Sequence, residues 1–232
     1  MSHPALLFLQ DLTGESEFID WEWLRENFWE DIVPAVQGHI FLSFVSIAIA
    51  MVISIPLGVL SARYRKIYPP VTFVTGVLYS VPSLAMFAIL VAAGISIGPT
   101  PVIIALVAYS LLILIRNTVA GLDSVPPETI DAARGMGLTD RQILLRVELP
   151  LALPIIVAGI RIATVTIIGI ATIGAYINGG GLGKLIFDGI NRQFPTMIIA
   201  GAVLATALAI VADLLLLAIE RYLRPWARAR RA

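Results

Sequence analysis

Five long apolar runs constrain the fold of this chain more than any other feature of its sequence. They lie at about 36–62, 70–94, 99–116, 151–175 and 196–219, and the third is the shortest. A helix needs about 20 apolar residues to cross the hydrocarbon core of a bilayer. Continuous hydrophobicity favours helices over a β-barrel, whose strands alternate. Only 14% of the residues are charged, whereas soluble domains carry about 25%. We therefore predict an all-α membrane protein with five transmembrane helices.

The basic residues predict how these spans are oriented. One side of the membrane would carry only Arg25, Lys184 and Arg192. The other side would carry Arg63, Arg65, Lys66, Arg116, Arg134, Arg141, Arg146, Arg221, Arg224, Arg228, Arg230 and Arg231. Because cytoplasmic loops are enriched in Lys and Arg, we expect the N-terminus outside and the C-terminus in the cytoplasm. The chain has no cysteine, so it has no disulfide or thiolate metal site, and we predict no metal site of another kind.

We divide the chain into an extracytoplasmic head (1–33), a transmembrane domain (34–225) and a basic cytoplasmic tail (226–232). The head is acidic and lacks the basic start of a cleavable signal peptide. Within it, Trp21, Leu24 and Phe28 recur at helical spacing. This pattern predicts a short helix at the membrane–water boundary, where Trp is favoured. Such a helix either anchors the first span or offers a docking surface to an extracytoplasmic partner.

Two spans contain an ionisable residue, which is costly in a bilayer and therefore a functional candidate. Arg161 in the fourth span and Asp213 in the fifth are expected at similar depths from the cytoplasmic side, so we predict that they pair. The alternative is that Arg161 snorkels or binds carbonyls while Asp213 binds a hydroxyl. The second span holds a polar group that either lines a pathway or packs ordinarily, beside a proline that can kink the helix. This group consists of Tyr79, Ser80, Pro82 and Ser83.

A polar island with clear local signals separates the third and fourth spans. Two consecutive prolines at 126–127 are suited to start a helix, and Gly137 can adopt the left-handed conformation that ends one. Thr139 and Gln142 then have the spacing of a capping box, which predicts a second helix that reaches Pro150, where the fourth span begins. Two short helices with a rigid bend would project below the membrane as an elbow. On patterning alone, the elbow is either a docking element or a self-contained loop.

The island at 126–150 resembles the coupling segment of the membrane subunits of binding-protein-dependent ABC importers. The pattern of that family is Glu-Ala-Ala, three residues, Gly, nine residues, and Ile-x-Leu-Pro. The matching positions, with Leu138 beside the glycine, are Asp131, Ala132, Ala133, Gly137, Val147, Leu149 and Pro150. The two departures are conservative, with Asp in place of Glu and Val in place of Ile.

The resemblance implies that the elbow docks on a separate cytoplasmic ATPase dimer. ATP and Mg would bind to that ATPase, so this chain would be no enzyme and would bind no cofactor itself. Closure of the ATPase would swing two permease subunits, identical or different, between inward-open and outward-open states. The other partners implied are an extracytoplasmic substrate-binding protein and membrane lipid, with no nucleic acid. The implied location is the inner (cytoplasmic) membrane of a prokaryote, as a multi-pass protein.

One run, GGGLGK at 179–184, is similar to a phosphate-binding loop but fails its pattern. That pattern requires Gly where this chain has Asn178, and Ser or Thr where it has Leu185. We interpret the run as a turn before a short amphipathic helix on the outer side of the membrane.

From about 28 to 225, the chain is similar to the osmoprotectant branch of the importer family, which takes up quaternary amines such as glycine betaine, choline and carnitine. The runs that carry this similarity include SIPLGVLSARY at 54–64, YSVPSLAMFAIL at 79–90, LPLALPIIVAGIR at 149–161, IGAYINGGGLGKLIFDGI at 173–190 and DLLLLAIERYLRP at 213–225.

One alternative function is that of an importer for another small solute, such as an amino acid or a thiol-betaine. A second is an ion-coupled secondary transporter that uses Arg161 and Asp213 as a relay. Nothing in the sequence favours a third, a non-transporting membrane scaffold.

Overall fold

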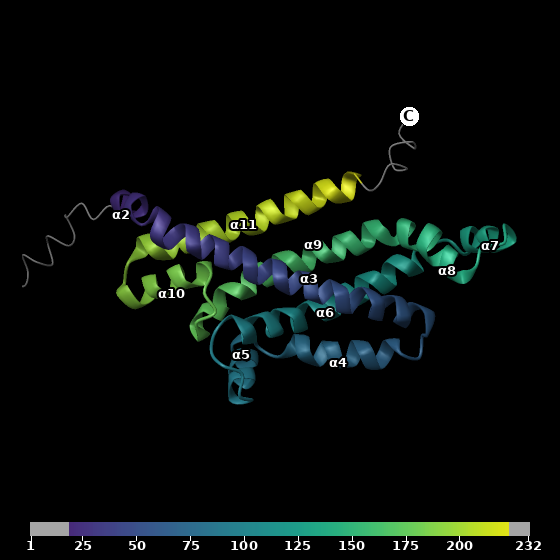
Figure 1. Ribbon diagram of the computed structural model, residues 1–232, viewed down its shortest axis with the longest axis horizontal. Helices are drawn as coiled ribbons and strands as arrows, with labels where there is room; N and C mark the ends of the chain where they lie inside the picture. Colours follow the sequence, from purple (N-terminus) through teal and green to yellow (C-terminus); the bar gives the residue numbers. More distant parts are fainter. Residues whose placement is uncertain (1–18, 223–232) are drawn as a thin grey trace, which may run out of the picture.

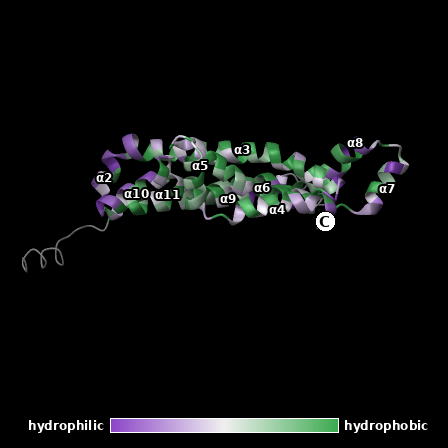
Figure 2. Ribbon diagram, turned by 90° about the horizontal axis from the view of Figure 1, so that it is seen from below, coloured by the Kyte–Doolittle hydropathy of each residue, from purple (hydrophilic) through white to green (hydrophobic). Residues whose placement is uncertain are grey.

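The computed structural model describes residues 19–222, and every regular element in this range is helical. Four long helices run side by side in an elongated bundle (Figure 1): α3 (Val33–Arg63), α6 (Pro99–Asp123), α9 (Leu149–Gly174) and α11 (Pro195–Tyr222). Each is long and apolar enough to cross a membrane. The middle of the bundle is mainly hydrophobic, and hydrophilic residues gather toward its two ends (Figure 2).

Shorter elements connect these four helices. They are α2 (Trp21–Glu26), the π-helical turn η1 (Phe28–Ile32), α4 (Tyr68–Ser80), α5 (Ser83–Ala92), α7 (Pro127–Gly135), α8 (Asp140–Ile143), the π-helical turn η2 (Leu144–Glu148), the 3-10 turn η3 (Ala175–Ile177) and α10 (Leu182–Arg192). The predicted tail at 226–232 and the first 18 residues of the predicted head lie outside the described residues.

The second apolar run is broken rather than straight. α4 and α5 meet at an angle of 97°, so the bundle has four candidate spans, or five if this bent pair counts as one. Val81 and Pro82 both have extended backbone at the break. A residue before proline is pushed out of the helical conformation, and the proline itself has no N–H to donate. The kink expected at Pro82 is therefore a nearly perpendicular turn.

The fourth span begins earlier than predicted. The helical backbone continues from α8 through η2 into α9, so that one helical segment extends over Asp140–Ile177. Pro150 lies in the first turn of α9 and does not interrupt it, because the N–H of Leu149 already donates to the carbonyl of Leu144 in the wide π turn. The elbow is thus joined to the span by continuous helix. The third span is also longer than predicted, since α6 continues to Asp123.

The core lies between α3, α6 and α9, and close backbone approach holds it together. Its buried side chains include Leu42, Ala50, Phe87, Leu106, Tyr109 and Ile167. A side chain on Gly58 of α3 would come within 2.6 Å of Thr118 on α6, so this crossing requires glycine. Such small-residue contacts are the usual way in which spanning helices pack. α11 lies at the edge of the bundle, where it packs against α9 and α10.

Candidate functional site

The elbow projects beyond the long helices at one end of the bundle (Figures 1 and 2). α7 ends in a Schellman arrangement, in which the N–H of Leu138 donates to the carbonyl of Ala133 (3.2 Å) and the N–H of Gly137 to that of Arg134 (2.9 Å). Gly137 has a φ of +82°, which is the left-handed conformation that this motif requires. The bend is therefore fixed by backbone hydrogen bonds.

A capping box starts the second arm of the elbow. The backbone N–H of Thr139 donates to Oε1 of Gln142 (2.8 Å), and the backbone N–H of Gln142 donates to Oγ1 of Thr139 (3.4 Å). Arg134 lies within 3.6 Å of Asp131 on its own arm and within 3.9 Å of Asp140 on the other. These ion pairs are exposed and contribute little stability. The elbow is a small, well-defined knob.

The predicted coupling residues lie on different surfaces of this knob and its base. Ala133 is buried inside the bend, whereas Asp131, Ala132 and Gly137 are exposed on its outside. Half-buried positions are occupied by Leu138 at the bend and by the residues at the base, Val147, Leu149 and Pro150. The exposed part of the pattern thus lies on the outside of the bend, and the less exposed positions lie inside the bend and at the base.

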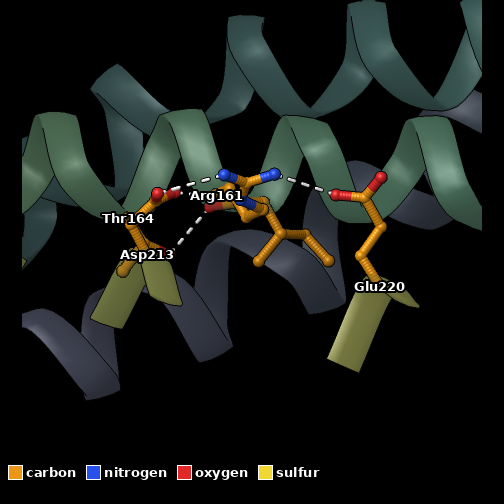
Figure 3. A network of polar contacts seen from close by, with 5 residues as sticks. Arg161, Thr164, Asp213 and Glu220 are labelled. Carbon is orange, nitrogen blue, oxygen red and sulfur yellow. Dashed lines mark hydrogen bonds and ion pairs between the residues drawn. The ribbon is translucent and has the colours of Figure 1, made fainter. Parts of the chain in front are cut away.

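A second polar site lies between α9 and α11 (Figure 3). Arg161 binds Asp213 through two hydrogen bonds, from Nε to Oδ1 (2.9 Å) and from Nη2 to Oδ2 (3.0 Å). Its Nη1 donates to Oε2 of Glu220 (2.9 Å). The side chains of Arg161, Asp213 and Glu220 are 23%, 35% and 10% exposed. The structure thus joins the two residues expected at similar depth and adds a second carboxylate.

The sequence argument missed Glu220, although a signal was present. Glu220 follows Asp213 by seven residues, which is two helical turns and therefore the same face of α11. Around the Arg161–Asp213 pair, a hollow opens between the two helices and is also lined by Ile162, Val165 and Thr166.

The polar residues predicted in the second span, from Tyr79 to Ser83, lie around the break between α4 and α5. They are thus separate from Arg161 on α9 and Asp213 on α11. Tyr79 is exposed and meets Tyr109 edge-on, with ring centroids 6.3 Å apart. The Ser80 hydroxyl donates to its own helix, at the carbonyl of Val77 (2.8 Å). The Tyr109 hydroxyl donates to the carbonyl of Val81 (2.8 Å) and so holds the break. Pro82 is exposed and Ser83 half-buried.

The opposite end of the bundle carries the glycine run, and there the structure places a buried histidine that sequence reasoning passed over. His39 on α3 accepts the N–H of Leu182 at Nδ1 (3.2 Å), so its Nε2 carries the proton and donates to the carbonyl of Ile168 (3.0 Å). An ionisable residue inside an apolar run was the available signal. Gly181, the N-cap of α10, has a φ of +73°, and a side chain there would come within 2.9 Å of His39 Nδ1.

A polar hollow of about 330 Å³ lies beside this turn. Both signs of charge line it, from η1 and α10: Glu30, Asp31, Lys184, Asp188 and Arg192. Within residues 19–222, no group of three or more His, Cys, Asp or Glu side chains could hold a metal ion.

Comparison of the chain with known proteins identifies its family. Residues 54–229 match the family described as the binding-protein-dependent transport system inner membrane component. The chain belongs to this family. The match includes the elbow and the Arg161 site, but it begins after His39.

Curated relatives are similar over most of their length. The choline transport system permease protein OpuBB of Bacillus subtilis is 40% identical over 195 residues, which are 84% of this chain and 89% of that protein. The glycine betaine/carnitine/choline transport system permease protein OpuCD of the same organism is 43% identical, over 84% of this chain and 85% of that protein. The osmoprotectant import permease protein OsmW of Salmonella typhimurium is 41% identical, over 81% and 89%.

A solved structure has the same fold. In the inward-facing conformations of the MetNI methionine ABC transporter, one chain aligns with a TM-score of 0.73 and 27% identity, over 82% of this chain and 95% of that chain. The chain is therefore a membrane protein with the fold of an ABC transporter permease.

Proposed function

We propose that this chain is the permease subunit of an ATP-driven importer for a quaternary-amine osmoprotectant of the glycine betaine, choline or carnitine type. The observation that carries the proposal is the capped, exposed elbow in a chain about 40% identical to permeases named for these solutes. A rigid knob at one end of a permease provides a contact through which an ATPase could move the membrane helices as a rigid body.

In this proposal the elbow end lies in the cytoplasm, and the N-terminus lies outside. The C-terminal ends of α3 and α11 lie at the same end of the bundle as α7 and α8 (Figure 1). Basic residues accumulate at that end, which agrees with the distribution expected for the cytoplasmic side. The glycine run and its charged hollow then face outward, where a substrate-binding protein would deliver the solute.

The elbow would fit a groove on a cytoplasmic ATPase, which binds ATP and Mg. Exposed Ala132 and Gly137 allow close approach, and exposed Met136 offers apolar contact. Because the elbow continues through η2 into α9 without a break, a displacement of the ATPase would move the span with it. Two permease subunits, identical or different, would enclose the pathway.

A single introduced cysteine tests the docking, since the chain has none of its own. Met136→Cys places a thiol at the tip without the strain that a side chain at Gly137 would cause. With a bifunctional crosslinker and the co-expressed ATPase, we expect an adduct under turnover. The matched control is Val52→Cys, an exposed position in the middle of α3, which should give none. Absence of any adduct at position 136 would contradict the proposed docking.

Solute identity requires a separate measurement. We expect the cognate binding protein to bind choline, glycine betaine or carnitine in titration calorimetry, and vesicle uptake of that solute to need ATP and the ATPase. The similarity to a methionine transporter favours one second candidate, an amino-acid importer. Binding of methionine or another amino acid in place of a quaternary amine would select it. Uptake without any ATPase would instead indicate an ion-coupled transporter.

A further inference from the structure

The base of the elbow contains a partly buried ion pair whose residues are not among the fixed positions of the coupling pattern. Glu148 is the last residue of η2, and its Oε2 lies 2.5 Å from Nη2 of Arg63, the last residue of α3. The side chains of Glu148 and Arg63 are 9% and 34% exposed. Of the Asp and Glu residues within 19–222, only Glu148 and Glu220 are buried. A buried carboxylate needs its partner, because a lone charge away from water is costly.

Tight packing surrounds this pair on the side of the bundle. Leu144, the first residue of η2, and Leu149, the first residue of α9, pack with Val59 and Ala62 of α3 in one cluster, around Leu122 of α6. α6 and α9 also approach each other closely near this pair. A side chain on Gly121 of α6 would come within 2.9 Å of the carbonyl oxygen of Ala152 on α9. The ends of three long helices therefore meet at the foot of the elbow.

The π turn makes this foot distinct from the helix on either side of it. η2 contacts both arms of the elbow, α7 and α8, as well as the start of α9. π turns within α-helices are rare and frequently occur at functional sites. Arg63 therefore contacts η2, which also touches both arms of the elbow and the span that follows.

We infer that Arg63 and Glu148 are a positioning pair that carries displacement of the elbow to α3. The inference rests on the proposed function, because it presupposes an ATPase that moves the elbow. Continuous helix already joins the elbow to α9, but α3 is connected to it only across space. Beside the apolar cluster, the ion pair at the end of α3 adds a charged connection to this foot, so that α3 and α9 move as one body.

Reconstituted transporter, containing the permease, its ATPase and its binding protein, tests this inference. The readout is solute transported per ATP hydrolysed, with radiolabelled choline or glycine betaine as the probe. Glu148→Gln should lower this ratio by about tenfold, a typical size for coupling between sites, while ATP hydrolysis per complex continues. A purely stabilising role would reduce the amount of complex and leave the ratio unchanged.

The matched control is the neighbouring pair of Arg65 and Asp123, which joins the α3–α4 loop to the end of α6 and is exposed. Asp123→Asn should leave the ratio of transport to hydrolysis within about twofold, because exposed ion pairs couple weakly. The charge-swapped variant Arg63→Glu with Glu148→Arg should recover most of the ratio lost in Glu148→Gln.

Each outcome decides the inference. A normal ratio in Glu148→Gln overturns it, and so does a charge swap that assembles and hydrolyses ATP but stays uncoupled. If Glu148→Gln fails to assemble, the swap alone decides between recovery and loss of coupling, and a swap that fails as well overturns the inference. If wild-type protein shows neither uptake nor ATPase binding, the proposed function fails instead, and this result is distinguishable from the others.

Discussion

The two ends of the bundle are held together by different chemistry. At the elbow end, charged side chains join segments that are distant in sequence, Arg63 with Glu148 and Arg65 with Asp123. From the middle of α9 toward this end, Arg161 likewise binds Asp213 and Glu220 of α11. At the opposite end, the cross-links are neutral and closely fitted. His39 binds two backbone groups, Thr196 accepts the N–H of Asp20 (2.8 Å), and Trp23 meets Phe194 edge-on with ring centroids 5.5 Å apart.

Because of this difference, we expect the elbow end to tolerate small movements of its helices and the opposite end to depend on close packing. Long charged side chains can follow each other through small displacements, whereas a glycine packed against a histidine cannot. We therefore expect substitutions at the glycine end to destabilise the whole bundle. Substitutions at the elbow end should act more locally or on coupling.

The largest loss of stability is expected for Gly181→Ala. Gly181 has a backbone conformation (φ +73°, ψ −169°) that is essentially restricted to glycine, and the new methyl group would also press on His39. Strain and overpacking together should cost about 3–4 kcal/mol, measured by thermal unfolding in detergent. Gly180→Ala is the matched control, since Gly180 has a φ of +81° but no neighbour within 4 Å. Equal melting temperatures for the two variants would contradict the role of the His39 contact.

The next largest loss is expected for His39→Leu. This change leaves the N–H of Leu182 without its acceptor at the first turn of α10, and a buried unsatisfied group costs about 1–3 kcal/mol. His39→Gln keeps one donor and one acceptor and should lose about half as much. Thermal unfolding of both variants measures the ranking. A glutamine variant no more stable than the leucine variant would show that ring packing, rather than hydrogen bonding, holds this end.

The parts of this structure that were predictable from sequence depend on neighbours in the chain. Thr139 and Gln142 are three residues apart, and Gly137 acts on the residues directly before it. Their side chains and backbone can therefore form the elbow without help from the rest of the fold. The break at Pro82 is also local, although its angle of 97° was not predictable, because packing of α5 against α6 and α9 accompanies it.

The parts that were not predictable depend on which helices become neighbours. Arg63 and Glu148 are 85 positions apart, and nothing in the spacing of either residue indicates the other. Arg161 and Asp213 could be matched by depth alone, but depth cannot tell which helices adjoin. Pro150 was expected to begin a span, yet the wide turn of η2 lets the helix continue through it. Only tertiary structure supplies these facts.

A smaller loss is expected at the Arg161 site, where partial exposure screens the charges. Arg161→Met should lower the melting temperature more than Asp213→Asn, because Arg161 also binds Glu220. The double variant should lose less than the sum of the single losses, which is the signature of direct coupling. Thr166→Val is the matched control, since its hydroxyl bonds only within α9, to Ile162. Strict additivity of the Arg161 and Asp213 changes would show that the pair contributes nothing.

The smallest and most local effect is expected for Thr139→Ala at the tip of the elbow. Loss of an N-cap hydroxyl costs about 1 kcal/mol, and here it removes the acceptor for the N–H of Gln142. Since α8 is short and exposed, this loss should open the elbow locally rather than unfold the bundle. Amide exchange of Gln142 and Ile143 should accelerate by about fivefold, while the melting temperature stays within about 1 °C of wild type. Thr139→Ser keeps the acceptor and should exchange like wild type. If Thr139→Ala instead lowers the melting temperature as much as His39→Leu, both ends are parts of one cooperative unit, and the contrast between a tolerant and a closely fitted end is wrong.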